Sequence, residues 1–285
     1  MNTKIIDGKQ ISSAVKEKIK EQVAMLKEKG INVGLAVILV GDNPASKVYV
    51  ANKKKACEDL GIKSFEYLLD ADTTSEQLIS LVEKLNNDPQ VNGILCQLPL
   101  PSHLDEGEVI RAINPEKDVD AFHPVNVGKI MIGDFDFLPC TPAGVMEMLH
   151  FCDICVSGKE CVVIGRSNIV GKPMSMLLLH ENATVSVCHS RTVDLKNVTR
   201  RADILVSAVG KAGFVTADMV KPGAVVIDVG MNRNSQGKLC GDVDYENVAP
   251  QCSAITPVPG GVGPMTIAML MQNTLTAAKK QNNII

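Results

Sequence analysis

In the stretch "KVYVANKKKACEDLG" (residues 47–61), three lysines stand in a row, and the first of them, Lys53, follows Tyr49 by one helical turn. On a helix that turns about 100° per residue, Lys53 projects about 40° from Tyr49, inside the arc of apolar side chains. Its two neighbours project to about 140° and 240°, where solvated charges belong. A lysine on an apolar face needs either a depressed pKa, as a general base does, or a partner for its charge. Lys53 is therefore a candidate catalytic amine, and the alternative is a solvated charge like its neighbours.

The stretch "GRSNIVGKP" (165–173) has the residue types of a phosphate-binding turn. It follows an apolar run and leads into a predicted helix, whose free N–H groups can face a pyrophosphate. The pattern resembles the dinucleotide motif G-x-G-x-x-G, although Ser167 replaces the middle glycine and Gly165 and Gly171 are too far apart. The phosphate loop of nucleoside triphosphatases fits less well, because too many residues separate the glycines and a proline stands where a metal-binding hydroxyl is needed.

The next predicted strand ends in "CHSRT" (188–192), which has no carboxylate to accept hydrogen bonds from the ribose 2′-hydroxyl of NAD. Ser190 and Arg191 at that edge, with Arg166 in the glycine turn, instead offer hydroxyl and cationic donors suited to a 2′-phosphate. The sequence therefore favours NADP over NAD. The alternative is that these residues are ordinary surface charges at loop ends.

Apolar runs alternate with amphipathic stretches along the chain, which predicts parallel α/β sheets. The predicted strands are "LAVILVG" (35–41), "FEYLL" (65–69), "VNGILCQLPLP" (91–101), "CVVIG" (161–165), "ATVSVC" (183–188), "ADILVSAVG" (202–210) and "GAVVIDVG" (223–230). We expect Ser46 to cap the lysine-bearing helix, Gly61 to end it, and the box Thr73–Glu76 to open the next helix. A Pro-, Asp- and Asn-rich stretch then interrupts the alternation, so we place a domain boundary near residue 140.

The length of 285 residues favours two domains. With 45% hydrophobic residues and a net charge of −3, the chain lacks the basic excess that favours nucleic acid or an anionic membrane, and we expect neither as a partner. Residues 1–30 are a Lys/Glu-rich amphipathic stretch rather than an apolar signal core, and no run reaches the roughly 18 apolar residues of a membrane span. We expect a cytoplasmic protein.

The nine cysteines are scattered without framework spacing, as suits free thiols in a reducing compartment. Cys152 and Cys155 form a C-x-x-C, but it lacks the second pair that a zinc site needs and does not open a helix after a strand. The five histidines are equally dispersed, with no pair spaced to bind a metal from one helix face. We predict no metal site.

Taken together and in this order, several motifs carry a family resemblance. They are "VGDNPASKVYVANKKKACEDLGI", "GILCQLPLP", "NPEKDVDAFHPVNVG", "CTPAGV", "VIGRSNIVGKPMSMLL" and "ITPVPGGVGPMT". The chain resembles, over nearly its whole length, the bifunctional methylenetetrahydrofolate dehydrogenase/methenyltetrahydrofolate cyclohydrolases. Two positions depart from the family pattern: Ala121 stands where KDVDG is usual, and Ala212 stands where VGKPGF is usual. Ala121 is expected to stiffen a turn, because alanine disfavours positive φ.

The resemblance implies oxidation of 5,10-methylenetetrahydrofolate by hydride transfer to NADP, followed by hydrolysis of the methenyl product to 10-formyltetrahydrofolate, which serves one-carbon metabolism and purine biosynthesis. It makes Lys53 the catalytic amine and Gln97 its hydrogen-bond partner. It also implies that the aromatic ring of Tyr49 packs against the folate. The carboxylate of Asp120 is expected to accept hydrogen bonds from the amino and ring N–H groups of the pterin. Each of these residues also has a structural alternative. The carboxylate of Asp120 would cap a turn, and the side chain of Gln97 would hydrogen-bond to the backbone. The prolines of "QLPLP" would simply end the strand in a rigid turn.

The resemblance also fixes which residues we expect to bind each ligand. The predicted folate-binding residues are Tyr49, Lys53, Gln97, Leu98, Pro99, Asp120, Pro259, Gly260 and Gly261. The predicted NADP-binding residues are Gly165, Arg166, Ser167, Ile169, Val170, Gly171, Ser190, Arg191, Thr192, Val209 and Gly210. The glycines of "PVPGGVGPMT" allow a backbone to approach the nicotinamide end of the cofactor closely.

The expected fold is α/β, with two α/β domains around a cleft. Residues 1–139 and 264–285 form the folate-binding catalytic domain, because the helix that begins near Pro264 packs back on the first domain in this family. Residues 140–263 form a Rossmann-type NADP-binding domain, and the resemblance implies a homodimer. Two other functions stay open: a monofunctional NADP-dependent dehydrogenase without cyclohydrolase activity, and a nucleotide-sensing module without chemistry.

Overall fold

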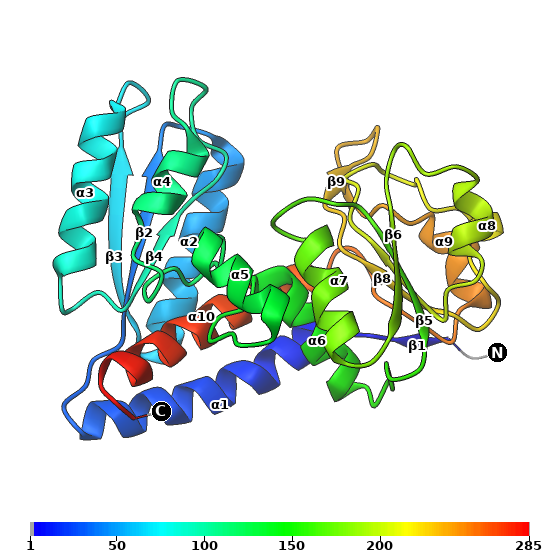
Figure 1. Ribbon diagram of the computed structural model, residues 1–285, viewed down its shortest axis with the longest axis horizontal. Coiled ribbons are helices and arrows are strands. Elements are labelled where there is room, and N and C mark those ends of the chain that lie inside the picture. The colour runs from blue at the N-terminus through cyan, green and yellow to red at the C-terminus, as the bar shows by residue number, and fades with distance from the viewer. Residues whose placement is uncertain (1–2, 285) are drawn as a thin grey trace. The chain divides into compact units, whose positions relative to one another are not determined.

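The computed structural model describes residues 3–284, which form two compact α/β units and confirm the predicted fold class. The three-stranded unit consists of residues 14–140 and 267–284, and the six-stranded unit of residues 3–13 and 141–266. Each unit is built around a parallel sheet with helices packed against it (Figure 1). None of the helices in the described part of the chain combines the length and apolarity needed to cross a membrane.

The sheet of the three-stranded unit has the order β3 (Lys63–Leu69), β2 (Gly34–Val40), β4 (Gly93–Cys96). The central strand β2 is buried along its whole length, as expected of a continuous apolar run in a parallel sheet. One face of β2 packs against α3 (Ser75–Asn87) and α4 (Glu106–Ala112). The chain then passes through α5 (Pro124–Ile132).

The helix that carries Lys53 is α2 (Pro44–Leu60), which packs against β2 and β3. Gly61 ends it with a φ of +75°, as predicted. The predicted cap was wrong: Ser46 lies inside the first turn, and its backbone N–H donates to the side chain of Asn43, the residue before Pro44. A proline is well suited to the first helical position, so the helix begins earlier than the sequence suggested.

The predicted opening of α3 was wrong by one residue. Thr74, not Thr73, is the N-cap, and it exchanges hydrogen bonds with Gln77 in a capping box. The hydroxyl of Thr73 instead donates to the carbonyl of Asp70 in the preceding turn. Threonine at either position satisfies the sequence pattern, and the preceding turn decides which one caps the helix.

The sheet of the six-stranded unit is parallel throughout. Its order is β1 (Lys4–Ile5), β11 (Ala254–Ile255), β8 (Val225–Asp228), β7 (Ile204–Ser207), β5 (Glu160–Ile164), β6 (Thr184–Cys188). The helical segments of this unit are α6 (Cys140–Phe151), α7 (Gly171–His180), α8 (Leu195–Thr199), η1 (Ala217–Met219), α9 (Tyr245–Val248) and η2 (Ala249–Gln251). A short hairpin, β9 (Asn232–Arg233) and β10 (Leu239–Cys240), follows β8.

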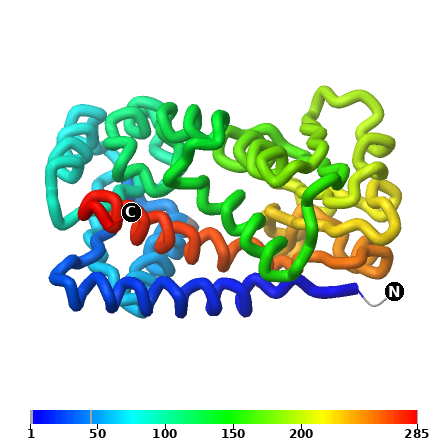
Figure 2. The backbone as a smooth tube through the Cα atoms, turned by 60° about the horizontal axis from the view of Figure 1, so that its bottom comes forward, coloured from blue at the N-terminus to red at the C-terminus, as the bar shows by residue number. Residues whose placement is uncertain are grey.

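Two long helices contribute residues to both units: α1 (Gly8–Glu28) and α10 (Val262–Gln281), which begins two residues before Pro264. Their portions in the three-stranded unit lie side by side, and Lys279 donates to the side chain of Gln22 at 2.6 Å (Figure 2). The two units divide the chain differently from the predicted domains, because residues 3–13 and 264–266 both belong to the six-stranded unit. Residues 3–13 join the six-stranded unit because β1 pairs with β11.

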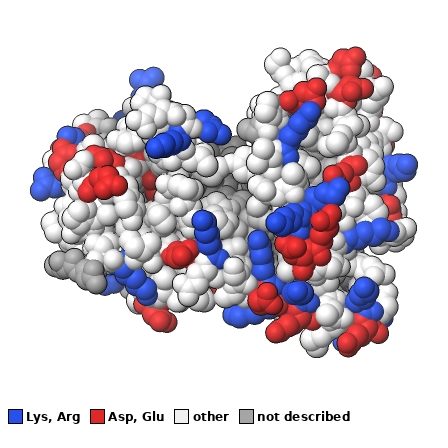
Figure 3. Space-filling model, turned by 180° about the vertical axis from the view of Figure 1, so that it is seen from behind, with Lys and Arg blue, Asp and Glu red and all other residues white. Residues whose placement is uncertain are grey.

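Acidic and basic side chains are interspersed on the face of the protein seen in Figure 3. This mixture of charges agrees with the net charge of −3.

Candidate active site

Lys53 is buried, with 9% of its surface exposed, whereas Lys54 and Lys55 are exposed. The predicted orientation of the three lysines is therefore confirmed. The Nζ of Lys53 donates to Oε1 of Gln97 at 2.7 Å, while Lys54 pairs with Glu66 on the surface. Periodicity alone predicted which lysine turns inward, because the apolar side of α2 faces its sheet.

Burial lowers the pKa of Lys53, and the negative charge of Asp120 partly opposes that effect. The hydrogen-bond partner of the amine is a neutral amide, which holds Nζ in place without stabilising its charge as a carboxylate would. A lysine whose pKa is lowered by burial loses its proton more readily than a solvated lysine, as a general base must.

Gln97 directly follows β4, and its backbone N–H continues the sheet by donating to the carbonyl of Ile38. Its side-chain Nε2 donates to the carbonyl of Leu98 at 2.7 Å, so the backbone contact considered as an alternative is present as well. Because Nε2 is engaged there, Oε1 is left to accept from Lys53. The carbonyl of Leu98 thus fixes one end of the amide, and Lys53 on α2 fixes the other.

Asp120 is half-buried, and burial raises its pKa to about 6, against the opposing charge of Lys53. The thiol of Cys140 donates to its Oδ1 at 3.7 Å. The next residue, Ala121, is fully buried with a φ of +57°, the conformation that the family glycine would adopt without strain. Lys53, Gln97 and Asp120 belong to one unit, and the charges of Lys53 and Asp120 affect each other's pKa.

The chain leading to Asp120 is anchored from several sides. The Nζ of Lys117 donates to the carbonyls of Leu85 (3.0 Å) and Asp88 (2.8 Å) at the end of α3. The buried carboxylate of Asp118 accepts from the side chain of Asn126 at 2.8 Å. These bonds fix the backbone on which Asp120 stands.

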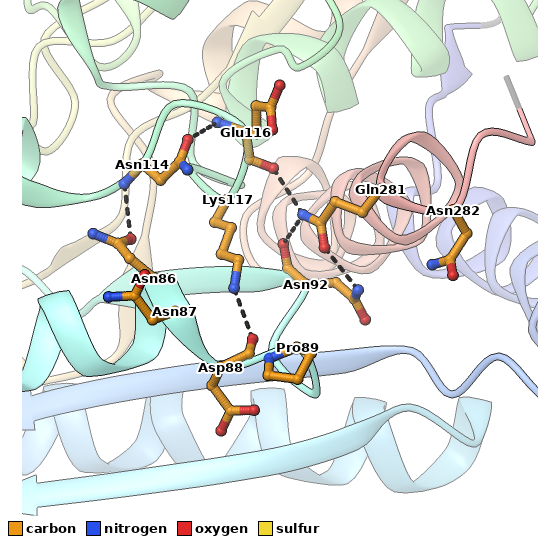
Figure 4. Close-up of a pocket in the computed structure, with 10 residues that line it drawn as sticks. All are labelled: Asn86, Asn87, Asp88, Pro89, Asn92, Asn114, Glu116, Lys117, Gln281 and Asn282. Carbon is orange, nitrogen blue, oxygen red and sulfur yellow. Dashed lines mark hydrogen bonds between the residues drawn. The ribbon is translucent and has the colours of Figure 1, made fainter.

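A polar cavity of about 380 Å³ lies beside Lys117. Its lining is Asn86, Asn87, Asp88, Pro89, Asn92, Asn114, Glu116, Lys117, Gln281 and Asn282 (Figure 4). The side chain of Gln281 donates to the carbonyls of Asn92 and Glu116, and Asn92 donates back to it. These polar groups bond mainly to one another, so we assign the cavity a structural role rather than a catalytic one.

Sequence reasoning missed two residues next to Asp120. Asn273, on α10, donates to the carbonyls of Val119 and Leu138, both at 2.8 Å. Cys140 lies between Asn273 and Asp120 and donates to the latter. A buried asparagine within the apolar run "MTIAMLMQNTL" was the available signal, because an amide in a core needs specific partners.

Tyr49 lies one helical turn before Lys53 on α2 and is half-buried. Residues at this spacing are neighbours on a helix surface, so the ring and the amine share one side of α2. Leu98 and Pro99 follow Gln97 and are partly exposed.

In the six-stranded unit, the glycine turn lies at the carboxyl end of β5, where sheets of this kind bind ligands. A Cβ on Gly165 would come within 2.4 Å of the carbonyl oxygen of Ala208, and one on Gly171 within 2.2 Å of the carbonyl oxygen of Gly165. Both glycines are therefore required by close backbone approach. The hydroxyl of Ser167 accepts from the N–H groups of Val170 and Gly171. The side chain of Ser167 thus satisfies two backbone N–H groups of the loop itself. The middle glycine of the usual motif has no side chain and cannot do so.

Arg166, Ser190 and Arg191 are exposed at loop ends of this unit. None of the ion pairs formed within residues 3–284 involves either arginine, so both guanidinium groups are available to an anion. Thr192 accepts from the backbone N–H of His189 and closes the turn after β6. Ile169 is exposed, and Val209 and Gly210 follow β7 at the same edge of the sheet.

The loop before α10 is shaped by close packing. A Cβ on Gly261 would lie 2.5 Å from the carbonyl oxygen of Pro257, and one on Gly8 would lie 1.8 Å from the carbonyl oxygen of Gly261. Gly260 has a φ of +102°. The backbone at Pro259, Gly260 and Gly261 is therefore held in a conformation that side chains would prevent.

Among the residues that the structure describes, no three His, Cys, Asp or Glu side chains gather as a metal site would require. The nine cysteines are all free thiols, and Cys152 is buried whereas Cys155 is exposed.

Comparison with known proteins decides the family. Residues 6–120 match the catalytic domain of tetrahydrofolate dehydrogenase/cyclohydrolase, and residues 139–282 match its NAD(P)-binding domain. The chain belongs to the tetrahydrofolate dehydrogenase/cyclohydrolase family. It is therefore an enzyme with dehydrogenase and cyclohydrolase activities, and its second matched region is an NAD(P)-binding domain.

Individual relatives agree along the whole length. The chain is 64% identical to the bifunctional protein FolD of Acetivibrio thermocellus, over 99% of each chain. It superimposes on the bifunctional FolD of Campylobacter jejuni with a TM-score of 0.96 and 52% identity, covering 98% of this chain and 99% of that one. The enzyme of Trypanosoma brucei, solved with NADP and an inhibitor, gives a TM-score of 0.94 and 40% identity over 98% of each chain.

Proposed function

We propose that this protein oxidises 5,10-methylenetetrahydrofolate to the 5,10-methenyl form with NADP and hydrolyses that product to 10-formyltetrahydrofolate, with Lys53 as the catalytic amine. The observation that carries the proposal is the pair formed by Lys53 and Gln97 across two elements of one unit, with the charge of Asp120 acting on it. A monofunctional dehydrogenase has no need for a buried amine whose pKa is lowered, so that alternative is not favoured.

In the hydrolysis, neutral Lys53 removes a proton from water while the oxygen adds to the electrophilic methenyl carbon. The bond from that carbon to N5 then breaks, the formyl group stays on N10, and one proton is released overall. Gln97 holds Nζ by its Oε1 and leaves the nitrogen lone pair free to accept the proton. The positive charge of the methenyl substrate lowers the pKa of Lys53 further, since like charges repel.

Asp120 positions the pterin rather than carrying a proton, because an ionised carboxylate accepts from paired N–H donors in bidentate fashion. Tyr49 supplies an aromatic wall on the same side of α2 as Lys53. Leu98 and Pro99 complete the lining after the strand end, and we assign the backbone at residues 259–261 a ligand-facing role as well.

The cofactor is NADP, and the six-stranded unit is its binding domain. NADP, when bound, accepts the hydride of the oxidation step. The glycine turn fits a dinucleotide, because Gly165 and Gly171 clear the space that side chains would fill. Arg166 and Arg191, both without an ion pair among the described residues, and Ser190 are assigned to the 2′-phosphate. Residues Ile169 and Thr192 lie at this edge and belong to the same proposed site.

The test follows methenyltetrahydrofolate formation and decay by absorbance, with purified protein and each dinucleotide. NADP should support faster formation than NAD, and the methenyl signal should then decay. A signal that forms without enzymatic decay would establish the monofunctional dehydrogenase, and bound NADP with unchanged folate would establish a sensing module.

A variant of Arg166 tests the preference for NADP over NAD. Arg166→Ala should weaken NADP binding by roughly tenfold or more and change NAD binding little, because a charge-assisted phosphate contact is lost. Equal losses for both dinucleotides would overturn the assignment of Arg166 to the 2′-phosphate.

We further propose a cytoplasmic homodimer that supplies formyl groups to one-carbon metabolism and purine biosynthesis. Family membership supports these statements. Light scattering of the purified protein at two concentrations tests the dimer, which a constant monomer mass would exclude.

A further inference from the structure

The loop that follows β7, residues 208–211, is held by a buried carboxylate that the proposed reaction does not use. Asp242 is completely buried. Its Oδ2 accepts from the N–H groups of Val209 (2.8 Å) and Gly210 (3.3 Å), and its Oδ1 accepts from the N–H of Lys211 (2.8 Å). Three consecutive backbone donors therefore converge on one side chain.

Two further donors complete the environment of Asp242. The hydroxyl of Ser207 donates to Oδ2 at 3.1 Å, and Nδ2 of Asn232 donates to Oδ1 at 2.9 Å. No ion pair within residues 3–284 includes Asp242, so its charge is stabilised by hydrogen bonds alone. A Cβ on Gly230 would lie 2.2 Å from Oδ1, which shows how tightly the backbone closes around the carboxylate.

A second buried carboxylate holds Asp242 in turn. Asp228, at the end of β8, accepts from the N–H groups of Gly230, Asp242 and Val243, each at 2.9 Å. A Cβ on Gly241 would come within 1.8 Å of its Oδ2. The two carboxylates therefore fix the loop after β7 to the end of β8.

This arrangement decides which polar groups the loop can offer to a ligand. All peptide bonds of the loop are trans, so the carbonyl in each peptide unit points away from the N–H that binds Asp242. The carbonyl of Ala208 lies over the glycine turn, 2.4 Å from where a Cβ of Gly165 would be. Val209 is half-buried, Gly210 is exposed, and within the described chain no backbone N–H bonds to the carbonyl of either. The loop thus presents acceptors and has no N–H left for a phosphate.

We propose that Asp242 is a positioning residue for the cofactor, which aims the carbonyls of Val209 and Gly210 at hydrogen-bond donors of the dinucleotide. Those donors are the hydroxyls of a ribose or the N–H groups of the carboxamide, because a carbonyl oxygen accepts from either. The inference rests on the proposed NADP-dependent function. It divides the site into a glycine turn that faces phosphate and a second loop that faces hydroxyl or amide groups.

The test measures both activities of Asp242→Asn. An asparagine replaces one acceptor oxygen with a donor, which cannot accept from the loop N–H groups. The KM for NADP should rise about tenfold or more, as expected for a lost set of hydrogen bonds. Hydrolysis of added methenyltetrahydrofolate, which needs no hydride transfer, should stay within about twofold of the parent protein. A merely structural role would lower both activities together.

The 3-acetylpyridine analogue of NADP, which lacks the carboxamide N–H, tests whether the carboxamide is the donor to these carbonyls. Loss confined to NADP identifies the carboxamide, and equal loss for NADP and the analogue excludes it. Thr199→Val is the matched control, because Thr199 is fully buried in the same unit and, among residues 3–284, its hydroxyl bonds only to the carbonyl of Lys196. It should leave the KM for NADP unchanged.

If Asp242→Asn does not fold, Asn232→Ala decides the question, since it removes one donor to the carboxylate from a partly exposed position. The KM for NADP should then rise about threefold. An unchanged KM in folded Asp242→Asn, or in Asn232→Ala where the first variant does not fold, overturns the inference. So does a parallel fall of both activities in Asp242→Asn. Failure of the proposed function would be distinct, because the parent protein itself would then lack NADP-dependent oxidation.

Discussion

The three-stranded unit contains two buried lysines in different surroundings. Lys53 is 9% exposed and Lys117 is 8% exposed, and burial is the largest cause of a lowered pKa in both. Lys117 donates to two backbone carbonyls at the end of α3. Lys53 donates to one neutral side-chain amide. Burial and pKa direction therefore do not distinguish a structural lysine from a catalytic one, whereas the partners do.

The partners differ in what they do to the charge. Carbonyls at a helix C-terminus carry partial negative charge and have no partners within the helix, so a cation there is stabilised and fixed in place. The single amide beside Lys53 orients the amine but leaves its lone pair usable. Lys117 is suited to hold the loop before Asp120, and Lys53 to exchange a proton.

The largest expected effect is that of Lys53→Met. Cyclohydrolase activity should fall by roughly 10²–10⁴-fold, the usual contribution of a general base. Dehydrogenase activity should stay measurable, because hydride transfer needs no such base and Tyr49 and Asp120 still position the ring. Both activities are measured on the same day with the same preparation.

Lys54→Met is the matched control, since Lys54 is exposed and belongs to the same helix. It should change neither activity. Comparable losses in the two variants, or normal hydrolysis in Lys53→Met, would return Lys53 to a structural role and remove the contrast with Lys117.

Lys117→Met should affect stability instead of chemistry. It leaves the carbonyls of Leu85 and Asp88 without their cation, and the free energy of unfolding should fall by about 1–3 kcal/mol. Urea unfolding measures the loss. The pH dependence of hydrolysis should keep its shape, and a change in that shape would show that Lys117 also titrates during the reaction.

The pH profile sharpens the contrast further. Asp120 has a pKa raised to about 6 by burial, so its acceptor form is lost as the pH falls through about 6. The kcat/KM for methylenetetrahydrofolate should therefore decline by up to about tenfold per pH unit below that value. Asp120→Asn should lower both activities and the affinity for folate, leave NADP binding intact, and abolish this decline. Persistence of the decline in the variant would assign it to another group.

The smallest expected effect concerns Ala121, whose φ of +57° strains an alanine next to Asp120. Ala121→Gly relieves about 1–2 kcal/mol of strain and loses roughly 0.5–1 kcal/mol through the greater freedom of glycine in the unfolded chain. The free energy of unfolding should rise by about 0.5 kcal/mol, measured by urea titration. A decrease would mean that packing of the buried methyl group outweighs the strain.

The sequence by itself determined the alternation of strands and helices, because apolar periodicity reflects which side of each element is buried. The same reasoning turned Lys53 inward and its neighbours outward, and placed Gly165 and Gly171 in a tight turn. The starts of α2 and α3 were misplaced, since Asn43 and Ser46, or Thr73 and Thr74, carry equivalent capping groups and the preceding turn selects between them.

Only the tertiary structure decided which distant groups meet. Gln97 reaches Lys53 because parallel strands and their helices bring the end of β4 beside α2, and no local pattern encodes that contact. Asn273 reaches the backbone beside Asp120 in the same way, across most of the chain. Only the folded sheet shows Asp242 buried beneath Val209–Lys211. Periodicity reports the side on which a residue lies, whereas its partners depend on how the elements pack.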